Sequence, residues 1–82
     1  MSGLSGQKVV VFGLGVSGRA AARLAVDQGA DVFGVDGRAD LAAIEGVQLH
    51  LGEADAADWL YAGVRVRAKH FHILVPLNNK IP

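Results

Sequence analysis

The chain has 82 residues, 51% of them hydrophobic, and its eight basic and eight acidic side chains give a formal net charge of zero. A chain of this length forms one domain at most, residues 1–82, and zero net charge argues against nucleic acid or an anionic membrane as its partner. The absence of cysteine excludes disulfides, a thiolate nucleophile and zinc–thiolate sites.

The first six residues contain neither the basic nor the apolar segment of a secretory signal. No apolar run approaches the ~20 residues that a membrane-spanning helix needs. We therefore expect a cytoplasmic protein.

The first predicted element is a strand over Lys8–Phe12, a mostly β-branched run that is typical of a buried strand in a parallel sheet. The motif Gly13-x-Gly15-x-x-Gly18 follows it directly. In such a motif the first glycine permits a tight exit from the strand, and the second lets a phosphate approach the backbone. The third allows close packing of the next helix. This order of elements indicates a nucleotide-binding βαβ unit.

An alanine-rich helical pattern continues to about Gln28, with Ser17 expected as its N-cap. Ala21, Leu24, Ala25 and Gln28 share one face of this helix. The small residues Ala21, Ala22 and Ala25 are expected to let it lie close to the sheet. The amides around Val16, Ser17 and Gly18 would be unpaired donors at the helix start. The positive end of the helix dipole favours an anion at the same place.

Further strands and helices are predicted beyond residue 30. The strands cover Asp31–Val35, Val47–Leu51 and Phe71–Val75; the helices cover Asp40–Glu45, capped by Asp40, and Ala54–Ala62, with Trp59 and Leu60 facing inward. Strands that alternate with helices predict an α/β fold, here a Rossmann-like three-layer domain. We expect a four-stranded parallel sheet in the order third, second, first, fourth, with right-handed crossovers.

Asp36 ends the second strand, about eighteen residues after Gly18. A carboxylate at this position can meet a ribose or a base, although Asp-Gly is also a common exposed turn. Arg38, two residues further on, can meet a 2′-phosphate or lie over a base. The residues alone therefore leave the nucleotide open.

At these positions the chain resembles the amino-terminal domain of the Mur ligases. The matching residues are the lead-in Leu4-x-Gly6-x-Lys8, the strand and glycine motif through Gly18, and the pair Asp36-x-Arg38. The resemblance covers residues 4 to about 60. It implies a domain that binds the UDP part of a UDP-N-acetylmuramoyl substrate.

The same resemblance implies roles for single residues. Val16 and Ser17 would meet the diphosphate, and Asp36, Gly37 and Arg38 would hold the uracil. Asp36 would accept a hydrogen bond from the ring, and the flat Arg38 guanidinium would pack over its face.

For the parent ligase, the resemblance implies that ATP and magnesium activate a carboxylate to an acyl phosphate, which the amine of D-glutamate then attacks. The chain has no G-x-x-x-x-G-K-[S/T] loop for ATP. We therefore expect a monomeric module that binds the UDP-sugar, works with the remaining ligase domains and does not catalyse on its own.

The segment over residues 63–82 departs from the family pattern. The Ser-Pro-Gly turn that the family has after the fourth strand is replaced by Val75-Pro76-Leu77, and a basic run precedes that strand. We assign no binding residue beyond about residue 60. His70 and His72 have no third ligand candidate, so no metal site is expected.

Two other readings fit the glycine motif and Asp36. One is the cofactor half of an NAD(P) oxidoreductase, with Arg38 near a 2′-phosphate. The other is a regulatory nucleotide-binding domain of a potassium-transport system, because Gly52-Glu53-Ala54-Asp55 is similar to a stretch in such domains.

Overall fold

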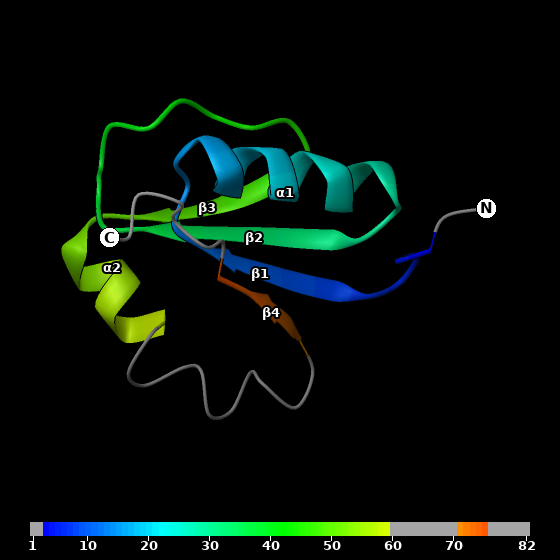
Figure 1. Ribbon diagram of the computed structural model, residues 1–82. Helices are drawn as coiled ribbons and strands as arrows, with labels where there is room; N and C mark the ends of the chain where they lie inside the picture. Colours follow the sequence, from blue (N-terminus) through cyan, green and yellow to red (C-terminus); the bar gives the residue numbers. More distant parts are fainter. Residues whose placement is uncertain (1–2, 60–70, 76–82) are drawn as a thin grey trace, which may run out of the picture.

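The computed structural model describes residues 3–59 and 71–75, which form a sheet with one helix on each face (Figure 1). The elements in chain order are β1 (Lys8–Phe12), α1 (Val16–Asp27), β2 (Asp31–Asp36), β3 (Val47–Leu51), α2 (Glu53–Ala57) and β4 (His72–Leu74). All four strands are parallel and lie in the order β3-β2-β1-β4. The predicted α/β class, Rossmann-like layering and strand order are confirmed.

The core consists of two clusters, one on each face of the sheet. Successive side chains of a strand point to opposite faces, so the three valines of β1 serve both clusters and are at most 1% exposed. Val9 and Val11 pack on the α1 side with Ala22 and Ala25. Val10 packs on the α2 side with Val35 and Trp59, and the rings of Phe12, Phe33 and Phe71 pack against this cluster. The candidate functional site lies at the carboxyl ends of β1 and β2.

The N-cap of helix α1 lies two residues before the predicted one. Gly15 is its N-cap, and no side chain caps it, so Ser17 lies inside the first turn and its predicted capping role is wrong. The buried face of α1 consists of Gly18, Ala22 and Ala25. The predicted close packing through Gly18, Ala22 and Ala25 is confirmed, whereas Leu24 is 59% exposed and its predicted place on the buried face is wrong. Only residues without long side chains face the sheet, which brings the helix close to it.

The predicted helix over Asp40–Glu45 is absent. Residues 37–46 instead form an irregular connection that arches past α1 between β2 and β3 (Figure 1). The reason is distance: β2 and β3 are parallel neighbours, so the connection must return along roughly 20 Å of strand. Six helical residues would advance only about 9 Å. Ile44, which is buried in the α1-side cluster, anchors this connection.

The last elements differ from the prediction mainly at their ends. Helix α2 starts at Glu53 and its regular α-helical part ends at Ala57. Trp59 is 5% exposed and faces inward as predicted, whereas Leu60 and residues 61–62 lie outside the described part of the chain. Strand β4 is two residues shorter than predicted. Within the described ranges, no helix has the length and apolar character needed to cross a membrane.

Candidate functional site

The turn after β1 is fixed by the backbone of β2. Gly13 has a φ of 92°, a conformation that side chains with a Cβ rarely adopt. Its amide donates a hydrogen bond of 2.8 Å to the carbonyl of Val35. The first glycine of the motif is therefore required by conformation.

Leu14 holds the turn in the core. Its side chain is 1% exposed and belongs to the α1-side cluster. A Cβ added to Gly34 of β2 would lie 3.0 Å from Leu14 Cδ1 and 3.2 Å from Leu49 Cδ2. The missing side chain of Gly34 thus provides the space into which Leu14 packs.

Gly15 is required neither by conformation nor by packing. Its φ is −74°, and no heavy atom lies within 4 Å of the place a Cβ would take. A side chain would instead extend into the open space at the start of α1. The absence of a side chain at this position keeps that space free for a ligand.

The first turn of α1 presents unpaired donors to this space. The first backbone hydrogen bond of the helix runs from the Arg19 amide to the Gly15 carbonyl at 2.9 Å. The amides of Val16, Ser17 and Gly18 precede it and have no acceptor among the described residues. Val16 is 90% exposed, and Ser17 is exposed as well. Helix-start amides of this kind bind anions, phosphates in particular.

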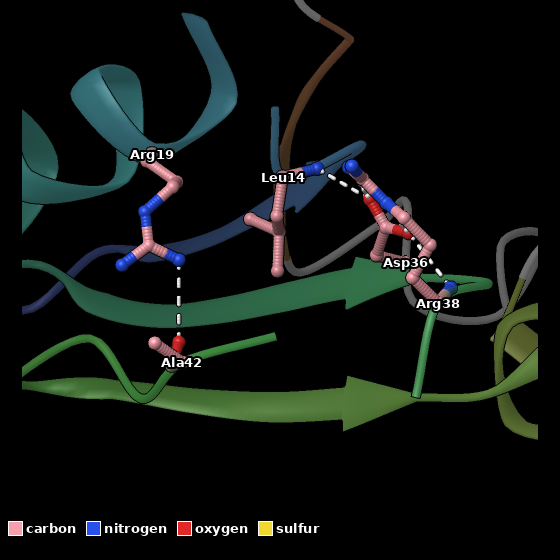
Figure 2. A network of polar contacts seen from close by, with 5 residues as sticks. All are labelled: Leu14, Arg19, Asp36, Arg38 and Ala42. Atoms are coloured by element: carbon pink, nitrogen blue, oxygen red, sulfur yellow. Dashed lines mark hydrogen bonds and ion pairs between the residues drawn. The ribbon is translucent and has the colours of Figure 1, made fainter. Parts of the chain in front are cut away.

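Asp36 connects the end of β2 to the glycine turn and to its own neighbour (Figure 2). Its Oδ2 accepts hydrogen bonds from the Leu14 amide at 2.7 Å and from Arg38 Nη2 at 2.9 Å. Its Oδ1 accepts hydrogen bonds from the Arg38 amide at 2.8 Å and from Arg38 Nε at 3.0 Å. A carboxylate has about four acceptor positions, so these bonds use its full capacity.

These contacts keep the carboxylate charged. The hydrogen bonds from the Arg38 side chain, together with those from the Leu14 and Arg38 amides, hold the pKa of Asp36 far below its usual range, although burial acts in the opposite direction. The same pairing raises the pKa of Arg38. The Arg38 side chain is 56% exposed while that of Asp36 is 9% exposed, so the outer side of the guanidinium remains open to solvent.

A cavity of about 390 Å³ opens beside this pair, at the carboxyl ends of β1 and β2. The strand ends contribute Phe12, Gly13, Val35, Asp36 and Gly37. Helix α2 contributes Glu53, Ala56 and Ala57. The carboxyl ends of parallel strands are where open α/β sheets bind their ligands.

The structure brings the predicted site residues to one end of the sheet, in two groups. Gly13, Asp36 and Gly37 line the cavity. Gly15, Val16, Ser17 and Gly18 form the adjoining turn and helix start, and Arg38 is held against Asp36. The glycine turn and the end of β2 are joined directly by the hydrogen bond from Leu14 to Asp36.

The contribution of α2 to the lining of the cavity was not predicted from the sequence. Ala56 and Ala57 belong to no motif, and Glu53 appears only in the Gly52–Asp55 stretch that is similar to one in regulatory domains. The signal that could have placed all three at the cavity is that they follow the third strand, whose carboxyl end meets that of β2. The Gly52 amide donates a 3.0 Å hydrogen bond to the Asp36 carbonyl, which places the start of α2 next to Asp36. Arg19 was also missed: its Nη1 donates to the Ala42 carbonyl at 3.2 Å and ties α1 to the 37–46 connection (Figure 2).

The histidines lie away from this cavity or outside the described residues. The His50 ring lies 4.6 Å from that of Trp59, and its Nδ1 is 3.4 Å from Asp55 Oδ2. His72 Nε2 is 2.9 Å from Gln7 Oε1. His70 lies outside the described ranges, as does the alternating run over residues 64–69.

The described residues contain neither a ligand set for magnesium nor the ATP-binding loop that would serve the ATP and magnesium implied by the family resemblance for a parent ligase. Within residues 3–59 and 71–75, no group of three or more His, Cys, Asp or Glu side chains could hold a metal ion. The glycine motif continues with Arg19-Ala20, where an ATP-binding loop has Lys followed by Ser or Thr.

Comparison with known proteins gives a match to part of the chain. The chain matches no protein-family model and no solved structure. A stretch of 37 residues is 62% identical to the UDP-N-acetylmuramoylalanine–D-glutamate ligase of Myxococcus xanthus (strain DK1622). That stretch is 45% of this chain but 8% of the ligase, so the chain spans only a small part of the relative's length. The chain therefore contains a Mur-ligase-like fragment, carried on a four-stranded parallel α/β domain.

Proposed function

We propose that the chain binds the UDP part of a UDP-N-acetylmuramoyl substrate, as the amino-terminal domain of an ATP-dependent amide ligase of peptidoglycan precursor synthesis. The observation that carries this proposal is the open space above Gly15, next to unpaired helix-start amides and a cavity at the ends of β1 and β2. The name of the partly matching relative supports it.

In the proposed mode, the diphosphate lies at the start of α1. The amides of Val16, Ser17 and Gly18 donate to its oxygens, and the Ser17 hydroxyl adds another donor. Gly15 lets the phosphates approach the backbone closely. This part of the proposal depends only on groups that have no protein partner among the described residues.

The uridine then lies toward the cavity that Asp36 and Gly37 line. In this proposal the exposed Arg38 guanidinium covers one face of the base while its inner edge stays on Asp36. A planar cation held in this way loses little conformational freedom on binding.

The reaction itself is assigned to other domains of a parent ligase. The described residues contain no ligand set for a metal ion, and the sequence has no ATP-binding loop of the G-x-x-x-x-G-K-[S/T] type, so this chain is proposed to bind substrate without turning it over. ATP and magnesium would act on the carboxylate of the same substrate, beyond the UDP moiety that this chain holds.

The test is a ligand titration followed by thermal denaturation and by NMR, with UDP, NAD, NADP and ATP each at millimolar concentration. Ligands that bind the folded state raise its stability in proportion to the logarithm of their excess over Kd, so even weak binding is measurable. We expect a response to UDP. A response to NAD or NADP instead would point to an oxidoreductase half-domain, and one to ATP would point to a regulatory nucleotide sensor.

A further inference from the structure

We propose that Arg19 is a positioning residue of the candidate site, which holds the 37–46 connection against the start of α1 and thereby sets the place of Arg38 beside the cavity. This inference rests on the proposed function, because it concerns how the side chain proposed to cover the base is held in place. Arg19 itself touches no ligand in this role and acts through the connection.

The first step of the argument is the course of the connection around Arg38. Residues 37–40 are all exposed, so this stretch has no side chain packed in the core. It is held at its start by the hydrogen bonds from Arg38 to Asp36. It is held at its end where the half-buried Leu41 and the buried Ile44 join the α1-side cluster. The place of Arg38 therefore depends on how both ends of the stretch are fixed.

The second step is the contact that Arg19 makes at the far end of this stretch. Its Nη1 donates to the Ala42 carbonyl at 3.2 Å, and Ala42 lies between Leu41 and Ile44 in the chain (Figure 2). Among the residues that the structure describes, this is the one hydrogen bond between α1 and the 37–46 connection. Apolar packing has no preferred direction, whereas a hydrogen bond does. Arg19 thus fixes an orientation that the two apolar anchors leave open.

The third step is the place of Arg19 on its own helix. Arg19 is half-buried in the first turn of α1, and its amide donates to the Gly15 carbonyl at 2.9 Å. The same residue therefore closes the helix start, where the diphosphate is proposed to lie, and reaches the connection that carries Arg38. In this mode the guanidinium of Arg19 holds the connection rather than a phosphate, and these two roles predict different binding results.

The experiment is isothermal titration of the full chain with UDP and with inorganic pyrophosphate, at about 0.15 M salt, where long-range charge effects are largely screened. Arg19→Ala removes the contact, and Arg19→Lys keeps a charged donor on a long stem. Arg23→Ala, at an exposed position one turn further along α1, is the charge-matched control. We expect Arg19→Ala to weaken UDP binding about threefold and to leave pyrophosphate binding unchanged. Arg19→Lys should recover most of the loss, and Arg23→Ala should bind both ligands like wild type.

A double-mutant cycle tests whether Arg19 acts through Arg38. In an Arg38→Ala background no guanidinium is left to be positioned, so the addition of Arg19→Ala should not weaken UDP binding further. A purely structural role of Arg19 would lower the unfolding temperature but would leave the ratio of UDP to pyrophosphate affinity in the folded chain as it is in wild type. Thermal denaturation of each variant is therefore measured beside the titrations.

Three results would overturn the inference. One is an unchanged UDP affinity in Arg19→Ala. Another is an equal loss of UDP and pyrophosphate affinity in Arg19→Ala but not in Arg23→Ala, which would make Arg19 a phosphate ligand. The third is a loss in the Arg19→Ala, Arg38→Ala double variant that equals the sum of the two single losses.

Two further arms keep the test decisive. If Arg19→Ala does not fold, Arg19→Met keeps the aliphatic stem without the donor, and the same comparisons are made with it. A folded wild type that does not bind UDP overturns the proposed function as well. UDP binding that every Arg19 variant shares with wild type overturns the inference alone, which separates the two failures.

Discussion

Asp36 and Arg38 are joined by two parallel hydrogen bonds, Nε to Oδ1 at 3.0 Å and Nη2 to Oδ2 at 2.9 Å. This two-point geometry is the one that guanidinium and carboxylate groups favour. The same carboxylate holds the Leu14 amide, 22 positions earlier in the chain. Asp36 is thus a structural link between the glycine turn and the end of β2, whatever ligand binds there.

Replacement of Asp36 with Asn should lower the free energy of unfolding by about 1–3 kcal/mol at pH 7, because charged hydrogen bonds to Leu14 and Arg38 are lost. The native pKa of Asp36 is depressed, so its contribution is complete above the unfolded value of about 3.9 and is lost as the pH falls from there toward the native pKa. Urea unfolding from pH 7 down to pH 2 should show the gap between wild type and Asp36→Asn closing in that acid range. Asp27→Asn, at an exposed position of α1, is the control and should track wild type; a constant gap would contradict the assignment.

Replacement of Arg38 with Ala should weaken UDP binding roughly threefold to tenfold, because the base loses a cation–π contact and its packing. Arg38→Lys should not restore the affinity, because an ammonium group is not planar and cannot hold Asp36 at two points. Calorimetric titration measures both effects, with Arg23→Ala on the exposed side of α1 as the charge-matched control. An unchanged UDP affinity in Arg38→Ala would remove the base-stacking role. A change confined to the preference between NADP and NAD would favour the oxidoreductase reading.

Replacement of Gly15 with Ser should separate folding from binding. Serine is a good N-cap, and Gly15 already has a φ of −74°, so the variant should be as stable as wild type or up to about 1 kcal/mol more stable. Its hydroxymethyl group would extend into the space that the phosphates need, so pyrophosphate and UDP should both bind more weakly. Thermal denaturation and titration measure the two effects. Ala20→Ser adds the same group to an exposed position of α1 and should leave binding unchanged.

Replacement of Trp59 with Ala should destabilise the fold by about 3–5 kcal/mol, because a large buried ring is removed and a void is left. Trp59 is 5% exposed, and its ring lies 5.8 Å from that of Phe33 and 6.0 Å from that of Phe71. Trp59→Phe should cost less, since it keeps a ring in the cluster. Urea unfolding followed by circular dichroism is the measurement. Leu24→Ala, a large residue that is 59% exposed, should cost under about 1 kcal/mol; equal losses would mean that burial is not the cause.

Much of the fold could be predicted from local patterns. The length and β-branched composition of Lys8–Phe12 and of the second apolar run predict strands, and the glycine motif predicts the turn into a helix. The rule that crossovers between parallel strands are right-handed then predicts the strand order. The prediction of a helix over Asp40–Glu45 was wrong because the connection from β2 to β3 must span the length of β2, and six helical residues are too short for that. Local propensity carries no information about this distance. On α1, the small residues Gly18, Ala22 and Ala25 were correctly predicted to face the sheet, but Leu24 was not, because the close approach of the helix leaves no room for a large side chain.

The candidate site was predicted less completely than the fold. The motif identified Gly13, Gly15 and Gly18, but the structure shows why glycine occurs at each position. Gly13 has a positive φ, Gly15 borders an open space, and Gly18 is buried against the sheet. The saturation of Asp36 could not be predicted, because it depends on the conformation of one neighbouring arginine. Glu53 could not be predicted either, since its place at the cavity follows from a tertiary hydrogen bond.

The packing of Leu14 into the space left by Gly34 limits which substitutions the binding turn can tolerate during evolution. A Cβ at Gly34 would already crowd the Leu14 methyl groups at 3.0 and 3.1 Å, and we expect a side chain larger than that of alanine to displace Leu14 and, with it, the turn that carries the helix-start amides. A random-mutagenesis screen for lost nucleotide affinity should therefore recover substitutions at Gly34, a core position that no ligand touches. Inheritance of the binding turn in related chains would then require that a small residue persist in the middle of the neighbouring strand.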